Sequence, residues 1–188
     1  MRKLECLLNN FIIKLLISMF KIGIEHLKKP YNEVLSALLN ELLNYFGDKF
    51  ISLVVYGSVA RGEARKNSDI DILLVIKDLP RSRFERQELF MKIEERIEEV
   101  LNKYYKKNYF IDFSPILKTP EEAEKITPLY LDMVEDAVII FDRDFFVKVL
   151  TRLKKRLDEL GAQRIKFGKK WYWILKKDYK FGEVINIE

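Results

Sequence analysis

Hydrophobic residues recur along the chain with two spacings, and the change between them predicts where helices give way to strands. Residues 3–22, 30–46 and 84–107 carry apolar side chains three and four positions apart, which is typical of amphipathic helices. Residues 51–56 and 70–76 are short, continuous apolar runs rich in β-branched residues, which indicates buried strands. The pattern therefore predicts two helices, then two strands in succession, then a third helix.

The C-terminal half continues this alternation. Residues 119–122 have the sequence of a capping box, and residues 137–141 predict a short strand. Asp142 is placed to cap a following helix that ends at Leu160, just before a glycine. Aromatic segments between residues 167 and 181 suggest a hairpin or short strands.

The turn after the first predicted strand carries small and polar residues. Gly57 has no Cβ, so an anion can approach its backbone closely. Ser58 adds a hydroxyl group, and the N–H groups that follow can open a short helix and bind an anion. This corner suits phosphate oxygens, although an ordinary strand exit would also explain these two residues taken alone.

Two carboxylates stand at the start of the second predicted strand. Asp69 and Asp71 are two positions apart, so the alternation of a strand places them on the same face. They repel each other unless they share a cation, and hard oxygen ligands favour Mg²⁺ or Mn²⁺. The alternative is that Asp69 only caps a turn with Ser68.

A third carboxylate, Asp112, stands within the apolar run of residues 109–115. Ile111 and Phe113 flank it and would face the opposite side of a strand. A carboxylate inside a strand is costly without a partner, and a metal shared with Asp69 and Asp71 would supply one. The alternative is a carboxylate on an edge strand that faces water.

These residues together form a recognisable pattern. Gly57-Ser58, ten residues, then Asp69-x-Asp71, with a later strand aspartate, resembles the nucleotidyltransferases of the DNA polymerase beta superfamily. The string Gly57-Ser58-Val-Ala-Arg61-Gly62 with Ser68-Asp-Ile-Asp71 is similar to the minimal nucleotidyltransferases of bacteria and archaea, over about residues 34–116. The resemblance implies an α/β (α+β) fold: a mixed sheet with helices on one face and an open metal and nucleotide site on the other.

The resemblance also implies a reaction. A nucleoside monophosphate, AMP from ATP as the first expectation, is transferred to an unknown acceptor with release of pyrophosphate by two-metal catalysis. Two Mg²⁺ or Mn²⁺ ions would be held by the three catalytic aspartates, Asp69, Asp71 and Asp112. The nucleotide-binding residues that it implies are Gly57, Ser58, Arg61 and Ser68. For Arg61, a solvated loop position is the alternative.

Two classes of function follow from the pattern. The first is an active transferase that uses a nucleoside triphosphate and modifies a protein, an RNA or a small hydroxylated acceptor. The second is a non-catalytic or weakly catalytic antitoxin-type module that neutralises a helical, toxin-like protein partner by covering it. The three intact aspartates favour the enzyme.

Composition narrows the picture without adding specificity. The 188 residues are 48% apolar and 34% charged, which is the balance of one globular domain. The one cysteine, Cys6, excludes a disulfide within the chain and predicts a cytoplasmic protein. The one histidine, His26, argues against serine-histidine hydrolases and histidine-rich zinc sites, so carboxylates are expected to carry the chemistry.

The two ends of the chain predict elaborations of a central domain. We expect an N-terminal amphipathic helical extension over residues 1–29, a nucleotidyltransferase domain over 30–145, and a basic, aromatic helix plus hairpin over 146–188, packed on the same domain. Polar residues interrupt the apolar run of residues 3–22, so we expect no membrane span. The favoured interpretation is a helix packed on the domain or on a partner; a membrane-surface helix comes second and a signal peptide third.

Charge gathers in the C-terminal tail. Residues 151–188 contain 11 Lys and Arg and 5 Asp and Glu, a net charge of +6 against +5 for the whole chain. Lysines interleaved with aromatic residues could bind RNA. The alternative, which we favour, is that Trp171 and Trp173 pack on one face of a strand while the lysines point to water.

Overall fold

A mixed five-stranded sheet lies at the centre of the computed structural model, which describes residues 19–168 and 170–187. The strand order is β1-β5-β2-β3-β4. β1 runs parallel to β5, β3 runs parallel to β4, and β2 is antiparallel to both β3 and β5. The strands are β1 (Lys21–Ile22), β2 (Phe50–Tyr56), β3 (Ile70–Ile76), β4 (Phe113–Lys118) and β5 (Val138–Asp142).

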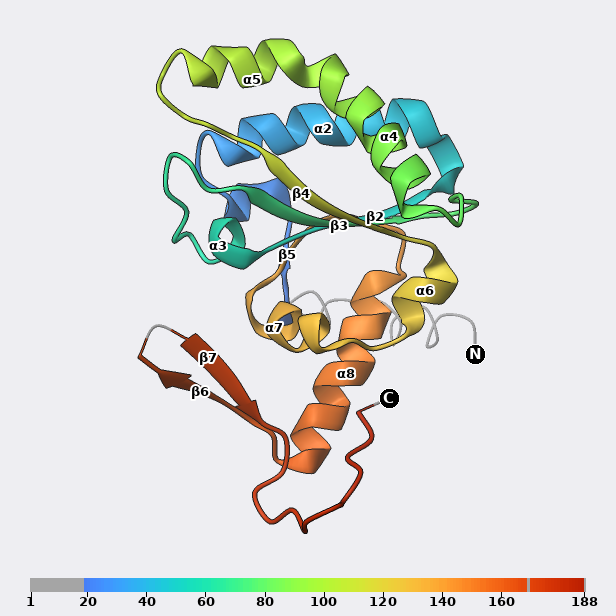
Figure 1. Ribbon diagram of the computed structural model, residues 1–188, viewed down its shortest axis with the longest axis vertical. Helices are drawn as coiled ribbons and strands as arrows, with labels where there is room; N and C mark the ends of the chain where they lie inside the picture. The colour runs from blue at the N-terminus through green and yellow to red at the C-terminus, as the bar shows by residue number, and fades with distance from the viewer. Residues whose placement is uncertain (1–18, 169, 188) are drawn as a thin grey trace, which may run out of the picture.

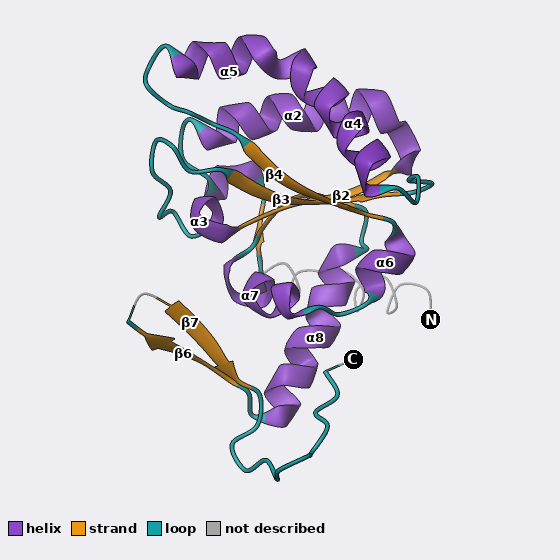
Figure 2. Ribbon diagram, in the orientation of Figure 1, coloured by secondary structure: helices purple, strands orange, loops and turns teal. Residues whose placement is uncertain are grey.

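Helices cover both faces of this sheet (Figure 1 and Figure 2). The helices on the first face are α2 (Tyr31–Phe46), α4 (Arg83–Glu94), the 3₁₀ turn η3 (Glu95–Ile97) and α5 (Glu98–Tyr105). Those on the second face are α6 (Pro120–Glu124), α7 (Pro128–Asp136) and α8 (Phe146–Leu160). The remaining elements are η1 (Ile24–His26), η2 (Gly47–Lys49), the short helix α3 (Gly57–Ala60), and the hairpin of β6 (Gln163–Phe167) and β7 (Lys170–Ile174).

The central strands are apolar on both sides, and this explains the two helical layers. In β3, Ile72 and Leu74 face the first core, whereas Leu73 and Val75 face the second. The α/β fold with a mixed sheet is therefore confirmed, but the expectation of helices on one face alone is wrong. An open second face would leave the alternate side chains of β2, β3 and β5 exposed to water.

Three predicted elements differ from the observed ones. The long helix over 84–107 is interrupted by the 3₁₀ turn at Glu95–Ile97. The helix over 3–22 cannot include its last two residues, because Lys21–Ile22 pairs with β5, and residues 3–18 lie outside the described residues. The strand expected around Asp112 begins only at Phe113, one residue later.

The predicted caps are confirmed. Thr119 and Glu122 form a capping box at the start of α6. The Asp142 carboxylate accepts hydrogen bonds from three N–H groups at the start of α8, with donor–acceptor distances of 3.0–3.2 Å. Gly161 ends that helix in the left-handed conformation. Local sequence rules therefore determined the ends of the helices that carry the second core.

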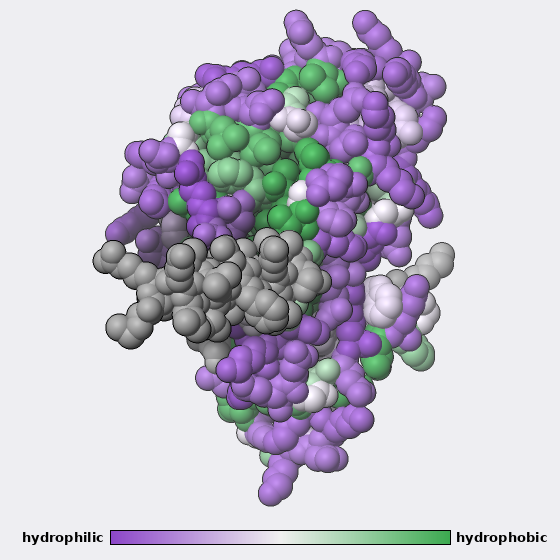
Figure 3. Space-filling view, turned by 180° about the vertical axis from the view of Figure 1, so that it is seen from behind, coloured by the Kyte–Doolittle hydropathy of each residue, from purple (hydrophilic) through white to green (hydrophobic). Residues whose placement is uncertain are grey.

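The surface is mostly hydrophilic. Seen from the rear, charged and polar residues surround a hydrophobic area in the upper half of the molecule (Figure 3). Among the described residues, no helix is both long enough and apolar enough to cross a membrane.

Candidate functional site

The sequence-predicted turn forms a tight corner where β2 ends and β3 begins. Tyr56 and Asp71 are partners in the antiparallel register of the two strands, and α3 starts directly after Tyr56 (Figure 1). Gly57 has a φ of +71°, and a Cβ on it would lie 2.9 Å from the Asp71 Cγ and closer still to Oδ2. Only glycine therefore lets the Asp71 carboxylate lie against the start of α3.

Asp69 and Asp71 are like charges in different surroundings. Asp69 is exposed and Asp71 is partly buried. Burial, and after it the charge of Asp69, raises the pKa of the Asp71 carboxyl, and Arg61 only partly offsets this. A shared divalent cation would remove the repulsion, so this pair fits the hard-ligand chemistry of Mg²⁺ or Mn²⁺.

Tyr56 belongs to the same corner, although its sequence position gave little sign of it. It is the last residue of β2 and pairs with Asp71. Burial, followed by the charge of Asp71, raises the pKa of the Tyr56 hydroxyl to about 12. The side chain therefore stays neutral beside the carboxylates.

Asp112 lies at the neighbouring strand but does not join the pair. Its carbonyl oxygen accepts the Ile70 N–H at 2.8 Å, one residue from Asp69. Its exposed carboxylate accepts the following Phe113 N–H at 2.8 Å, and its charge adds to burial in raising the pKa of Glu94. Within residues 19–168 and 170–187, no group of three or more His, Cys, Asp or Glu side chains is close enough to hold a metal.

The other predicted residues surround the corner. Ser58 lies within α3, and its carbonyl oxygen accepts the Glu63 N–H at 2.9 Å. The Ser68 hydroxyl accepts the Arg65 N–H at 2.9 Å, which closes the turn ahead of Asp69. Arg61 lies directly after α3 and donates to Glu63 at 2.9 Å. The structure thus brings Gly57, Ser58, Arg61, Ser68, Asp69 and Asp71 into one corner and leaves the Asp112 side chain outside it.

Sequence reasoning missed the residue that links Arg61 to the C-terminal hairpin. The last residue of α7, Asp136, lies 3.8 Å from the Arg61 guanidinium and 2.6 Å from that of Arg164 in β6. Arg164 also lies 3.4 Å from Asp132, and its Nε is buried without a hydrogen-bond partner. No local pattern signals these contacts, because they join three separate elements.

The hairpin sets its cations beside its tryptophans. Arg164 pairs with Trp173 and Lys166 with Trp171 across the two strands, so all four lie on one face. The Arg164 guanidinium lies 4.4 Å from the Trp171 ring, and the Trp173 indole donates to Asp132 at 3.2 Å. Trp173 packs on the second core as we expected, whereas Trp171 is exposed. Arg164 contacts the carboxylates of α7.

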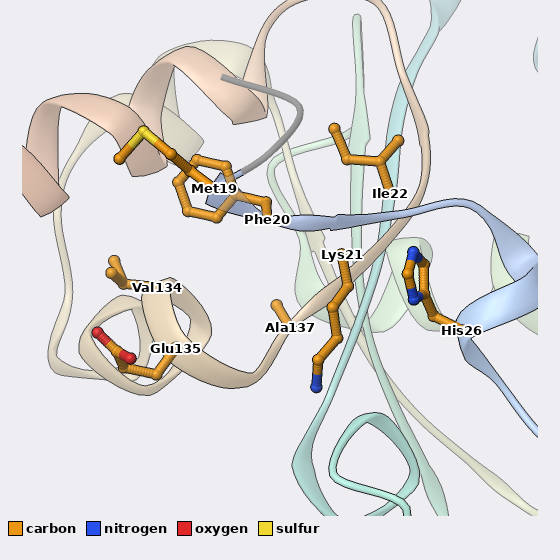
Figure 4. A pocket seen from close by; sticks show the side chains of 8 residues that line it. All are labelled: Met19, Phe20, Lys21, Ile22, His26, Val134, Glu135 and Ala137. Atoms are coloured by element: carbon orange, nitrogen blue, oxygen red, sulfur yellow. The ribbon is translucent and has the colours of Figure 1, made fainter. Parts of the chain in front are cut away.

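A separate cavity of about 410 Å³ lies between β1 and α7 (Figure 4). Its lining includes Phe20, Ile22 and Val134, with Lys21 and Glu135 at its polar side. It contains none of the residues predicted to bind nucleotide or metal. This cavity is therefore separate from the corner formed by Gly57 and Asp71.

Comparison with known proteins identifies the class to which this corner belongs. The model of the nucleotidyltransferase domain family matches residues 36–129, half of the chain, which includes every predicted site residue. The chain belongs to this family, and it is a nucleotidyltransferase. The minimal type implied by the Gly-Ser and Asp-x-Asp motifs is thereby confirmed.

Two relatives from Methanocaldococcus jannaschii carry the provisional name protein adenylyltransferase. One is 35% identical over 147 residues, which are 77% of this chain and 95% of the relative. The other is 26% identical over 104 residues, 55% of this chain and 91% of the relative. A crystal structure of a toxin-antitoxin with AMP-PNP is 20% identical, covers 66% of this chain and 90% of that one, and has a TM-score of 0.42.

Proposed function

We propose that this protein transfers AMP from ATP to a side chain of a partner protein and releases pyrophosphate. The close approach of Asp71 to Gly57 carries the proposal, because it sets a metal-binding carboxylate beside a phosphate-binding turn. The names of the two relatives support a protein as the acceptor and adenylate as the group transferred. The hairpin favours protein over RNA, because Arg164 and Trp173 are already bound to Asp136 and Asp132.

Each residue of the corner has a role in this proposal. The Gly57 and Ser58 backbone and the Ser58 hydroxyl bind the outer phosphates, and Ser68 holds the turn that precedes Asp69. Arg61 adds a guanidinium group to a phosphate once it leaves Glu63. Asp69 and Asp71 would hold two Mg²⁺ ions. Asp112 is the proposed third ligand, once its carboxylate leaves the Phe113 N–H, because it directly precedes Phe113, the partner of Ile70 in the β3–β4 register.

The bound ions would supply charge neutralisation at the attacking and leaving oxygens of the transfer. The raised pKa of Asp71 is consistent with this, since a cation would relieve both the repulsion from Asp69 and the cost of burial. Tyr56 remains neutral and so adds no further negative charge to the corner.

Labelled ATP tests the proposal directly. The pure protein with Mg²⁺ and a cell extract should transfer label to protein, and Asp71→Asn should lower the rate by about 10²–10³-fold. Asp144→Asn is the matched control: Asp144 is exposed, has a φ of 55° that asparagine tolerates, and lies outside the corner. It should keep the normal rate.

The competing function makes a different prediction for the same assay. An antitoxin-type module would bind its partner protein tightly and transfer nothing from any of the four nucleoside triphosphates. Such a result, or an Asp71→Asn variant as active as the wild type, would replace the enzyme with a protein that acts by covering its partner.

A further inference from the structure

A second, smaller pocket lies behind the turn that follows α3. It has a volume of about 280 Å³. Five parts of the chain contribute to it: η1 with the segment after it, the start of α2, α3, the turn between α3 and β3, and the segment ahead of β4. Its lining residues are His26, Lys28, Lys29, Tyr31, Val59, Gly62, Ala64, Arg65, Lys66 and Tyr109.

The pocket holds an excess of positive charge. Four of its lining residues are lysines or arginine and none is acidic. Lys29 has a partner, Glu33, at 2.5 Å. Among the described residues, Lys28, Lys66 and the Arg65 guanidinium have no ion-pair partner, and the Lys66 ammonium lies 5.2 Å from the centre of the Tyr109 ring. Like charges around one hollow repel each other, so an anion in the hollow would stabilise them.

The pocket is distinct from the Gly57–Asp71 corner. Val59, Ala64, Tyr31 and Tyr109 pack with the first core, and Asp71 alternates with residues of that core along β3 and so faces the opposite side of the sheet. Neither Ser58 nor the two aspartates line the pocket. The two sites share α3 and the turn between α3 and β3, but no residue of the Gly57–Asp71 pair lines the pocket.

The backbone on the pocket side is held in place before any ligand arrives. The Tyr31 hydroxyl donates to the Arg65 carbonyl oxygen at 2.7 Å, and the Arg65 N–H donates to Ser68. Phe110 donates its N–H to the Lys66 carbonyl oxygen at 2.7 Å. The cations at residues 65 and 66 therefore start from a fixed backbone, which lowers the entropy cost of binding.

We propose that this pocket binds a short chain of phosphates, such as inorganic triphosphate, independently of the nucleotide in the Gly57–Asp71 corner. Four cations converge from two segments, the one after η1 and the turn between α3 and β3, which suits a ligand that carries several negative charges on a small frame. The volume is slightly below the range of roughly 300–1,000 Å³ for pockets that hold drug-sized ligands, so a compact anion fits better than a stretch of nucleic acid. The proposal does not depend on the acceptor or on transferase activity.

Calorimetric titration with inorganic triphosphate tests it, with EDTA present to remove metal from the corner and at about 0.15 M ionic strength. We expect one binding site in the wild type and binding about tenfold weaker, or more, in Lys28→Gln/Arg65→Gln/Lys66→Gln. The matched control is Lys77→Gln/Lys92→Gln/Lys148→Gln, which removes three exposed cations with no ion pair among the described residues. It should bind like the wild type.

The single histidine of the chain, His26, lines both this pocket and the β1–α7 cavity, so its signal reports on the ligand together with the triple variant and not alone. Its ring proton signal in an NMR titration should move with triphosphate, because the ligand would lie beside the ring. The proposal is overturned by no binding, by equal weakening in both triple variants, or by an unmoved His26 signal. Weaker binding in Ser58→Ala would also overturn it, because the phosphates would then occupy the corner.

Discussion

The Gly57–Asp71 corner and the C-terminal hairpin handle charge in opposite ways. In the corner, two aspartates face only one nearby cation, Arg61, and the pKa of Asp71 is raised. In the hairpin, Arg164 is neutralised within the chain by Asp136 and Asp132. A cluster with excess negative charge is stabilised by binding a cation, whereas a cluster whose charges are paired holds its elements together. Breaking the corner should therefore cost activity, and breaking the hairpin should cost stability.

The largest effect is expected from Gly57→Ala. The added Cβ would displace the Asp71 carboxylate, and a misplacement of this size costs about 10²-fold in rate. The positive φ also costs roughly 1–2 kcal/mol of folding stability. Label transfer and urea unfolding measure the two effects.

Gly62→Ala separates these two effects. Gly62 also has a φ of +71°, but no atom lies within 4 Å of the position of its Cβ. This variant should lose similar stability and keep most of its activity. If its activity fell as far as that of Gly57→Ala, backbone strain and not the displaced carboxylate would explain the loss.

Asp136→Asn addresses the hairpin. It removes the negative charge that lies 2.6 Å from the Arg164 guanidinium, whose Nε already lacks a hydrogen bond, so the free energy of unfolding should fall by about 1–3 kcal/mol. Asp132→Asn is the control, because its 3.4 Å contact is longer and its carboxylate more exposed. Its loss should be smaller. If Asp136→Asn lowered the transfer rate at a temperature where the variant is still folded, the hairpin would serve the reaction through Arg61.

The smallest effect concerns Tyr56. Removing the Asp71 charge in Asp71→Asn should lower the pKa of Tyr56 from about 12, yet leave it above 10 because burial is the larger cause. NMR with labelled tyrosine, titrated from pH 9 to 12, follows the change. A pKa that stays at about 12 would mean that the two side chains do not interact.

The corner was predictable because its residues are close in sequence as well as in space. β2 and β3 are neighbours, so Gly57 and Asp71 meet through one antiparallel register. Asp112 is the instructive exception. The long connection through α4 and α5 allowed a parallel strand beside β3, so the position of Asp112 next to β3 could be expected. However, β4 begins one residue later, at Phe113, and the Asp112 carboxylate accepts the Phe113 N–H.

The sequence by itself determined the two central strands, the capped helices and the charge of the tail, because strand pattern, capping and composition act over a few residues. The mixed sheet was an expectation from the family resemblance. Only the tertiary structure decided that helices cover both faces, that Asp136 lies between Arg61 and Arg164, and that unpaired cations gather behind the turn. Those arrangements join segments far apart in the chain. Their energies depend on burial and on distances between charges, which no local pattern encodes.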